Sequence, residues 1–257
     1  MKGKRHLDFY KNNRKYADLL SSVENSLYNK YLAMMKPKNK GIKVLDVGCG
    51  VGTVVNQMIK RGWGEIYGID VSETFLKIAR RGQGSFKLFD GSKIPFKDSF
   101  FDVVGSFAVL EHVDNPLEIL GEMVRVTKRN GIIIVASPNF LRVIGFSSFH
   151  PRTDGLIRSL TNLSLLIKKY YCSILIKNSM HFEFMEPILD VPFKADYDAI
   201  CLTNPVDVKY FLRKRNVRII YQSGLVSYHK SFLINFLSTL PVLRELSGGF
   251  FLVGVRN

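Results

Sequence analysis

The chain has 257 residues, 46% of them apolar, which is enough to bury one full hydrophobic core. Its formal net charge is +15, and its 3 cysteines lie far apart without a CxxC pair, which disfavours a disulfide framework and a zinc site. Residues 1–40 are polar and basic, and no stretch reaches ~18 uninterrupted apolar residues, so the sequence indicates neither secretion nor a membrane span. We therefore expect a cytoplasmic protein.

The positive charge lies outside the middle of the chain. Residues 44–140 hold 11 basic and 11 acidic side chains, whereas residues 1–43 hold 11 against 3 and residues 141–180 hold 6 against 1. Residues 207–230 repeat this surplus with 6 against 1, and residues 181–206 are acidic, with 1 against 5. We expect the basic segments to surround a substrate mouth and to favour an anionic partner or surface; the alternative is a solvated surface without a partner.

Apolar and tyrosine side chains recur at steps of three or four residues in the N-terminal arm: Tyr16, Leu20, Val23, Leu27 and Tyr31. This period predicts one amphipathic helix before Lys36-Pro37. From residue 43 the pattern predicts alternating strands and helices, which favours a mostly parallel sheet covered on both faces. The expected strands are 43–47, 65–69, 85–89, 101–108 and 131–136, and the expected helices are 52–61, 73–81 and 116–129.

The regular alternation stops after Pro138. Residues 140–180 mix apolar runs with Lys and Arg, which predicts an insertion of one or two helices. Asn204-Pro205 then predicts the start of a helix to about Arg215. A strand at 217–222, an apolar and partly helical stretch at 232–246, and a final strand follow.

The run VLDVGCGVG, residues 44–52, places glycines at every second position directly after a strand. Only a backbone pressed against a ligand needs that pattern. A second apolar run ends at Asp70, a spacing that fits a strand, glycine turn, helix and strand with a ribose-binding carboxylate at the second strand's tip. Asp46, inside the first strand, would repel a pyrophosphate but suits a ligand with an ammonium group.

Three further motifs follow in order: FDGSKIPF, FDVVGSFAVLEHVDNP and the strand GIIIVASPN. Together with the glycine run they cover residues 42–140, and their order resembles the class I S-adenosylmethionine-dependent methyltransferases, in the large subfamily that includes quinone and small-molecule methyltransferases. The resemblance implies an α/β, Rossmann-like doubly wound, mostly parallel seven-stranded sheet with an N-terminal helical arm and a helical cap insertion. The expected segments are the arm (1–40), the cofactor-binding core (41–139), the cap (140–200) and the C-terminal part of the core sheet (201–257), which ends in a hairpin beside the sixth strand.

The implied cofactor is S-adenosyl-L-methionine, and the implied binding residues are Asp46, Gly48, Cys49, Gly50, Gly52, Asp70, Val71, Asp90, Gly91 and Phe107. The backbone N–H groups from Gly48 to Gly52 suit the methionyl carboxylate, and Asp46 suits its ammonium group. Both oxygens of Asp70 would take ribose hydroxyls. The resemblance places Asp90 and Gly91 at the adenine amine, Val71 and Ile94 against the ring, and Phe107 beside the methionyl chain. As alternatives, Asp90 is an ordinary turn acid and Cys49 a small buried filler.

His112 is the candidate general base, since it follows the fourth strand and histidine titrates near neutral pH. The alternative is a histidine that fixes loop geometry. His150 and His181 lie at the two ends of the cap and either enter the substrate pocket or face water. A site made of Glu111, His112 and a cap histidine is the metal-binding alternative; no compact ligand spacing supports it, so no metal is predicted.

The preferred acceptor is a small molecule or a lipid- or glycan-linked molecule, methylated at oxygen. Basic and apolar residues share the same insertions, as in LLIKKYY, and this mixture suits peripheral contact with an anionic membrane, here the inner face, through Lys168 and Lys169. RNA methylation is one alternative, because the chain is basic and rich in tyrosine and phenylalanine. A catalytically silent protein that binds S-adenosylmethionine is another.

Overall fold

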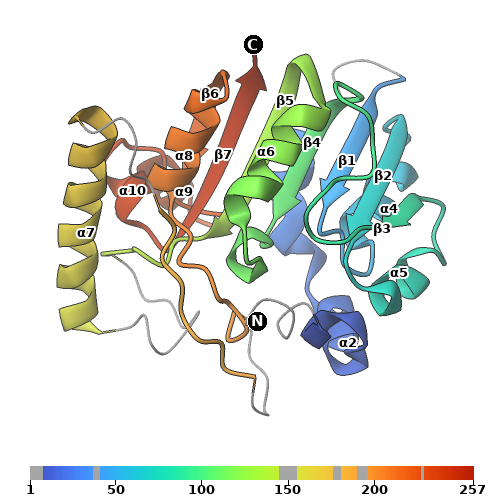
Figure 1. The fold of residues 1–257 in the computed structure, drawn as a ribbon, viewed down its shortest axis with the longest axis horizontal. Helices are drawn as coiled ribbons and strands as arrows, with labels where there is room; N and C mark the ends of the chain where they lie inside the picture. Colours follow the sequence, from blue (N-terminus) through green and yellow to red (C-terminus); the bar gives the residue numbers. More distant parts are fainter. Residues whose placement is uncertain (1–7, 37–40, 145–154, 176–180, 190–195, 227–228) are drawn as a thin grey trace. The chain divides into compact units, whose positions relative to one another are not determined.

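The strands of the chain form one seven-stranded sheet in the order β3-β2-β1-β4-β5-β7-β6 (Figure 1). The computed structural model describes residues 8–36, 41–144, 155–175, 181–189, 196–226 and 229–257. The pairs β3–β2, β2–β1 and β1–β4 are parallel. The expected Rossmann-like, mostly parallel seven-stranded sheet is confirmed, and β7 returns beside β6 as expected.

The strands are β1 (Lys43–Val47), β2 (Glu65–Asp70), β3 (Ser85–Leu88), β4 (Phe101–Phe107), β5 (Thr127–Pro138), β6 (Val217–Ser223) and β7 (Gly249–Arg256). The α-helices are α2 (Arg14–Ser22), α3 (Asn29–Met35), α4 (Thr53–Lys60), α5 (Glu73–Ala79), α6 (Pro116–Val126), α7 (Leu156–Leu175), α8 (Pro205–Lys214), α9 (Phe232–Leu237) and α10 (Leu243–Leu246). Two short 3-10 helices are η1 (Asn25–Tyr28) and η2 (Leu110–His112).

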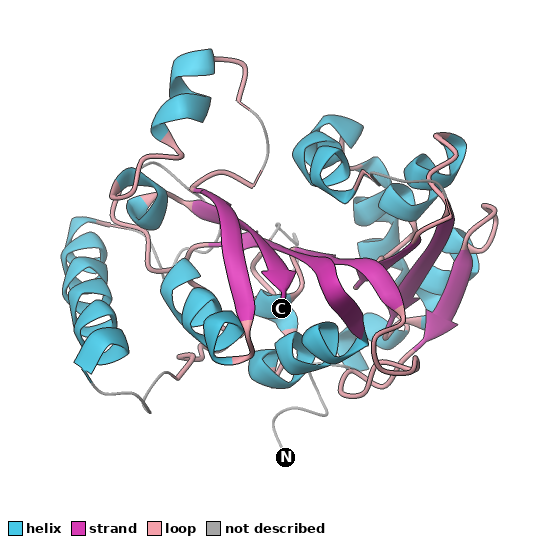
Figure 2. Ribbon diagram, turned by 90° about the horizontal axis from the view of Figure 1, so that it is seen from above, coloured by secondary structure: helices cyan, strands magenta, loops and turns pink. Residues whose placement is uncertain are grey.

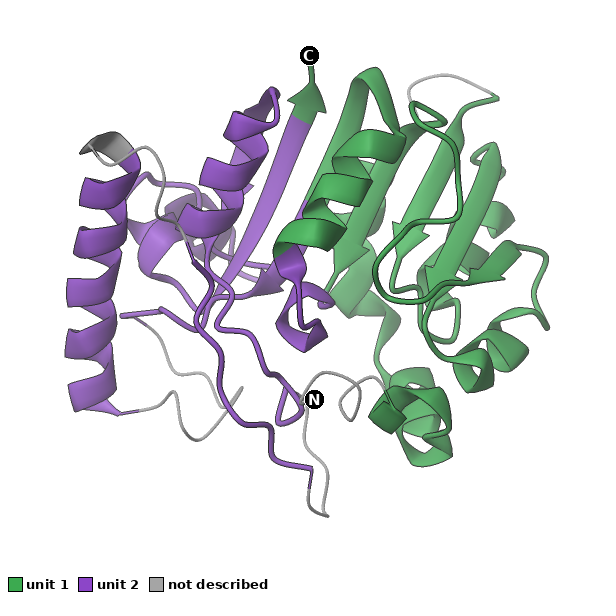
Figure 3. Ribbon diagram, viewed as in Figure 1, with its two compact units in different colours: residues 1–107, 117–134, 255–257 green, residues 108–116, 135–254 purple. Residues whose placement is uncertain are grey.

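The chain divides into two compact units (Figure 3). Unit 1 contains residues 1–107, 117–134 and 255–257, and unit 2 contains residues 108–116 and 135–254. The division into an arm, a core, a cap and a C-terminal segment stays a prediction.

In unit 1 the ends of three strands meet around Asp46. Val44, Leu45 and Val47 of β1 are buried, so this strand is apolar on both faces, as a central parallel strand requires. Asp46 interrupts it and pairs with Gly68 of β2 and Gly105 of β4. Helices lie on both sides of the strands (Figure 2).

The N-terminal arm differs from its prediction, because the single helix expected there is broken. Helix α2 ends at Ser22, and Val23 is extended, with φ −63° and ψ 130°. The hydroxyls of Ser21 and Ser22 donate to the carbonyls of Ala17 and Leu19, and such side-chain bonds to the local backbone compete with helical structure. The arm resumes as η1 and α3, and Tyr31 of the predicted stripe is buried in α3.

The end of α6 was also wrong in the prediction. The helix stops at Val126, and Thr127 already begins β5, although Gly131 was expected to mark the helix end. Thr127, the first residue of the strand, is β-branched and buried, which favours the extended conformation over a helical one. Gly131 lies within the strand instead, where an added Cβ would stand 2.7 Å from the Thr127 side chain.

Unit 2 contains the long helix α7 and the capped helix α8. The Asn162 side chain donates to the carbonyls of Phe140 and Arg142, and this holds α7 to the chain that follows β5. Helix α8 begins as predicted, since Asn204 accepts from the Asp207 N–H at 3.0 Å and Pro205 occupies the first turn. Within the described ranges, no helix has both the length and the apolar character that crossing a membrane requires.

Candidate cofactor and active site

The glycine run after β1 forms a tight loop in unit 1. Gly48, Gly50 and Gly52 have φ values of 73°, 53° and 80°, which side chains with a Cβ rarely adopt. The N–H groups of Gly48 and Cys49 both donate to the Ile69 carbonyl, at 2.8 and 3.0 Å. These bonds tie the loop to the end of β2.

The loop N–H groups are therefore largely engaged within the protein. Gly50 donates to Asp70, and Gly52 donates to the Cys49 carbonyl at 2.9 Å. Gly52 is the N-cap of α4 and supplies no capping side chain. The first N–H groups of α4 have no intrahelical acceptor, and they offer an anion better donors than the Gly48–Gly52 backbone that the sequence predicted.

Asp46 is a buried carboxylate that the fold surrounds closely. Its Oδ1 accepts a 2.7 Å hydrogen bond from the Tyr31 hydroxyl, which α3 supplies. Gly105, its neighbour on β4, makes this bond possible, since a Cβ there would collide with the Tyr31 ring and hydroxyl. Burial raises the pKa of Asp46 to about 7, and the nearby charge of Asp70 adds to the increase. A cation beside this carboxylate would offset the cost of burying its charge.

Three aromatic rings lie beside this carboxylate. The Phe107 ring, at the end of β4, is 5.3 Å from the Tyr28 ring and 5.4 Å from the Tyr31 ring, measured between centroids. Burial and the Asp46 charge raise the pKa of Tyr28. Aromatic faces next to a carboxylate suit a cationic ligand. Tyr28 was missed from the sequence, because it lies off the predicted apolar stripe, and it belongs to the 3-10 helix η1 that follows the end of α2.

Asp70 ends β2, as predicted, and is also buried. Its Oδ2 accepts from Gly50 N–H at 2.8 Å and its Oδ1 from Ser72 N–H at 2.9 Å. Burial raises its pKa to about 6, against the lowering effect of these backbone bonds. Each oxygen has a second lone pair, so both oxygens keep the capacity to accept a ribose hydroxyl.

The arm covers this end of unit 1. Val71 packs on a cluster of Tyr10, Ala17, Val51 and Phe75. Leu20 of α2 lies over the glycine loop, 3.2 Å from where a Gly50 Cβ would stand. The Ser72 hydroxyl donates to the Tyr10 carbonyl at 2.7 Å.

Asp90 and Gly91 form an exposed turn after β3. Asp90 Oδ1 accepts from the N–H groups of Ser92 and Lys93, both at 2.9 Å, and these bonds hold the pKa of Asp90 below its usual value. Gly91 has φ 89°. Asp90 thus serves the turn itself, and its role toward a ligand stays a prediction. Ile94, expected against the adenine ring, is buried in the core.

The Cys49 side chain fills a space that another glycine leaves. A Cβ at Gly68 would stand 2.8 Å from Cys49 Sγ, so the thiol packs directly on β2. Burial raises the pKa of this thiol well above its usual value. These surroundings agree with the interpretation of Cys49 as a small buried filler. We therefore expect only its backbone to contact a cofactor.

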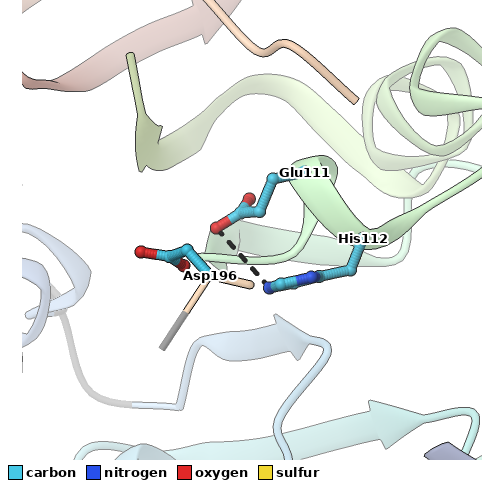
Figure 4. Close-up of side chains that lie close together, drawn as sticks. All are labelled: Glu111, His112 and Asp196. Atoms are coloured by element: carbon cyan, nitrogen blue, oxygen red, sulfur yellow. Dashed lines mark ion pairs between the residues drawn. The ribbon is translucent and has the colours of Figure 1, made fainter. Parts of the chain in front are cut away.

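In unit 2, His112 lies among carboxylates (Figure 4). Its Nε2 is 3.9 Å from Glu111 Oε1, and its Nδ1 is 3.3 Å from Asp198 Oδ2. Asp196 lies at the same place, because ligand atoms of Glu111, His112 and Asp196 all fall within 4.8 Å of one another. The acidic segment 181–206 supplies both aspartates, which the sequence did not connect with His112.

Glu111 is held from several sides. Its Oε2 accepts from the Ser137 hydroxyl at 2.9 Å, and its backbone carbonyl accepts from the N–H groups of Ile200 and Cys201. Burial raises the pKa of Glu111, although the charge of His112 counteracts this. Burial alone would lower the pKa of His112, but Asp198, Glu111 and Asp196 together raise it.

The two cap histidines do not complete this group among the described residues. His150 lies outside the described residues, and the His181 carbonyl accepts from Lys169 at the surface. The third potential ligand beside Glu111 and His112 is the carboxylate of Asp196.

Residues 45–135 match a family profile described as a methyltransferase domain. The chain is 31% identical over 146 residues to an uncharacterised methyltransferase of Schizosaccharomyces pombe, covering 51% of this chain and 52% of that protein. It is 33% identical over 120 residues to a demethylmenaquinone methyltransferase of Geobacillus kaustophilus, covering 43% and 51%. The central part of the chain is therefore similar to methyltransferase domains. The chain spans about half the length of these curated relatives.

Solved methyltransferase structures share the fold. A methyltransferase from Mesorhizobium loti has a TM-score of 0.60 at 14% identity, covering 90% of this chain and 99% of that one. A geranyl diphosphate C-methyltransferase from Streptomyces coelicolor has a TM-score of 0.56 at 11% identity, covering 96% and 85%. At these identities the likeness establishes the fold alone.

The methyltransferase cofactor, S-adenosylmethionine, fits what unit 1 offers. Its ammonium and sulfonium groups are cations, and the buried Asp46 carboxylate beside three aromatic rings is the environment that would bind a cation. Its carboxylate matches the uncapped start of α4, and Asp70 offers lone pairs for hydroxyls.

Proposed function

We propose that the chain transfers a methyl group from S-adenosylmethionine to an oxygen of a small-molecule or lipid- or glycan-linked acceptor. The observation that carries this proposal is the buried Asp46 carboxylate between the glycine loop and the aromatic rings of Tyr28, Tyr31 and Phe107. A buried carboxylate without a cation is costly, and a cationic ligand removes that cost.

Methyl transfer needs positioning more than covalent catalysis. S-adenosylmethionine supplies an electrophilic methyl group on a sulfonium, and the acceptor oxygen displaces the sulfur in line. Asp46 and Asp70 would orient the two ends of the donor, while Tyr28 and Phe107 would shield it from water. An acceptor hydroxyl must lose its proton, and His112 is the candidate to take it, with Asp198 3.3 Å from its Nδ1.

The class of acceptor rests on relatives and on the surface of unit 2. The matched relatives include demethylmenaquinone methyltransferases, which act on a quinone by name. On α7, large apolar side chains point outward: Leu156, Ile157, Leu160, Ile167 and Tyr171 are 60–83% exposed. Lys168 is exposed beside them. An apolar stripe with a basic neighbour suits peripheral contact with an anionic membrane, where lipid-linked acceptors reside.

Cofactor binding is tested first, by calorimetry with S-adenosylmethionine and its demethylated product. Asp70→Ala removes contacts to the ribose and should weaken binding about ten- to a hundredfold. Asp114→Asn, at an exposed carboxylate before α6, is the control and should bind as the parent does. Equal affinity for Asp70→Ala, or preferred binding of NAD, would overturn the assignment.

Methyl transfer is tested with S-adenosylmethionine labelled on its methyl group. Fractions of cell extract are incubated with the protein and analysed by mass spectrometry. Label in the lipid or small-molecule fraction supports the proposal. Label in RNA supports an RNA methyltransferase instead, and binding without any labelled product supports a catalytically silent protein.

A further inference from the structure

The cluster around His112 holds more negative charge than its own groups neutralise. Glu111, Asp196 and Asp198 share one imidazole, and Glu111 is fully buried. Taking such charges out of water costs several kcal/mol per ion unless a cation or a proton compensates.

One buried oxygen of the cluster, Glu111 Oε1, indicates a bound ligand. Glu111 Oε1 is buried and accepts no hydrogen bond within the described structure, whereas Oε2 of the same carboxylate accepts from Ser137. Figure 4 shows the Glu111 carboxylate turned toward the imidazole and Asp196. A buried carboxylate oxygen with no donor is rare in native proteins and requires an explanation such as a bound ion.

Side chains around the cluster hold His112 and Glu111 in position, as the hydrogen-bond partners of metal ligands do at metal sites. Asp198 Oδ2 lies 3.3 Å from Nδ1 of His112, and Glu111 Oε1 lies near the other ring nitrogen, Nε2. This is the position from which a carboxylate orients a histidine ligand. Ser137 fixes the Glu111 carboxylate, and Thr203 in turn bonds the Ser137 hydroxyl at 2.9 Å. A carboxylate behind a histidine ligand is the usual second partner at metal sites.

We propose that Glu111 Oε1, His112 Nε2 and an Asp196 carboxylate oxygen bind one divalent cation of the Mg²⁺ or Mn²⁺ class. Two carboxylates and one imidazole match the oxygen-rich donor sets of these ions, and three ligands leave positions for exchangeable oxygens. Adjacent ligands of such an ion lie about 3 Å apart, so the three atoms, now within 4.8 Å, close in slightly on binding. Asp196 and His112 are partly exposed, which gives the ion an entry path. The sequence predicted no metal, because its third ligand is distant in the chain and is not a histidine.

The cation has a role at the proposed reaction, and this part rests on the proposed function. An acceptor oxygen placed in an open coordination position would be held in a fixed orientation, and its hydroxyl would deprotonate more easily. The ion would lower the pKa of that hydroxyl, and its proton would pass to solvent water, because His112 is no longer a free base once its Nε2 binds the ion.

Binding is measured without cofactor or acceptor, by the loss of the free Mn²⁺ signal in electron paramagnetic resonance. We expect one Mn²⁺ per chain, displaced by Mg²⁺. Glu111→Gln and Asp196→Asn should each weaken Mn²⁺ binding at least tenfold. Asp114→Asn changes an exposed carboxylate two residues from His112 and should leave binding unchanged.

Two results would overturn the proposal: no saturable Mn²⁺ binding below millimolar concentration, or unchanged binding in Asp196→Asn. Circular dichroism checks the fold, and Asp196→Asn decides the outcome if Glu111→Gln does not fold, since Asp196 is partly exposed. S-adenosylmethionine binding, measured on the same samples, separates the two proposals. Its retention while Mn²⁺ fails to bind rejects the cation site and leaves the proposed function standing.

Discussion

Two buried carboxyl groups, Asp46 and Asp70, make the end of the β1–β2 pair sensitive to pH. Their pKa values are raised to about 7 and about 6, mainly by burial, whereas an unfolded chain keeps aspartate near ~3.9. Between these values the folded chain binds more protons than the unfolded chain. Their contribution to stability is therefore present below pH ~4 and is lost as the pH rises through 6 and 7.

This gives a prediction for the unliganded protein. Its free energy of unfolding should fall between pH 5 and pH 7.5, by about 2.5 kcal/mol from Asp46. Asp46→Asn should show a shallower decrease, because the Asp46 carboxyl no longer contributes to it. Urea denaturation at the two pH values measures both slopes. Equal slopes for parent and variant would contradict the raised pKa of Asp46.

The residues of this region show what a sequence can reveal. Asp46, the three glycines and Asp70 follow from spacing alone, because the strand, turn and helix between them are continuous in the chain. Tyr28 does not, because its place depends on the extended Val23 that separates α2 from η1. Nor does Asp196 beside His112, because a contact between distant segments leaves no periodic signal.

At the scale of elements, the predicted core helices and strands lie close to the observed ones, and the errors have local causes. Serine side chains that bond the backbone split the arm into two helices. The buried, β-branched Thr127 begins β5 where the prediction continued α6. In both places the spacing of apolar residues predicted a continuous helix, whereas local side chains favoured another backbone conformation.

Arg125 links α6 to the loop that follows β3. Its guanidinium donates to the carbonyls of Ile94 and Phe96, both at 2.9 Å, and forms ion pairs with Glu122 and Asp98. Glu122 in turn accepts from the Ile94 N–H at 2.8 Å. One side chain therefore fixes the backbone that continues from the turn of Asp90 and Gly91.

Arg125→Met should loosen this loop while keeping most of the apolar stem. We expect the free energy of unfolding to fall by about 1–3 kcal/mol, since the Ile94 and Phe96 carbonyls lose their charged donor. Affinity for S-adenosylmethionine should fall as well, if the turn contacts adenine. Arg129→Met, at an exposed arginine just beyond α6, serves as the control. Denaturation and calorimetry together would contradict this account if Arg125→Met matched the control in both.

At the scale of the whole molecule, the regional charge count predicted an anionic partner, but it did not show which of two neighbouring lysines faces solvent. Lys168 and Lys169 were both expected to meet a membrane. The structure places Lys169 against Asp207 at 2.9 Å, with that aspartate buried, and leaves Lys168 exposed. Charge reversal at Lys169 would bury two like charges together and damage the fold, so only Lys168 is suitable for testing surface contact.

The outer face of α7 gives the sharpest test of membrane contact. Leu160 and Ile167 lie two helical turns apart on that face and are 61% and 62% exposed, so replacing both by serine should leave stability unchanged. We expect the parent protein to sediment with anionic vesicles more than with neutral ones. Salt should weaken this binding, because charges are screened over a Debye length of about 8 Å at physiological ionic strength.

Leu160→Ser with Ile167→Ser should reduce sedimentation with the vesicles, and Lys168→Glu should reduce the preference for anionic lipid, both without change in cofactor affinity. Ile220→Ser is the matched control, since Ile220 is an isoleucine of β6 that is 49% exposed. Equal sedimentation of all variants would show that α7 does not meet the membrane. Salt-dependent binding of RNA in place of vesicles would assign the basic surface to a nucleic acid.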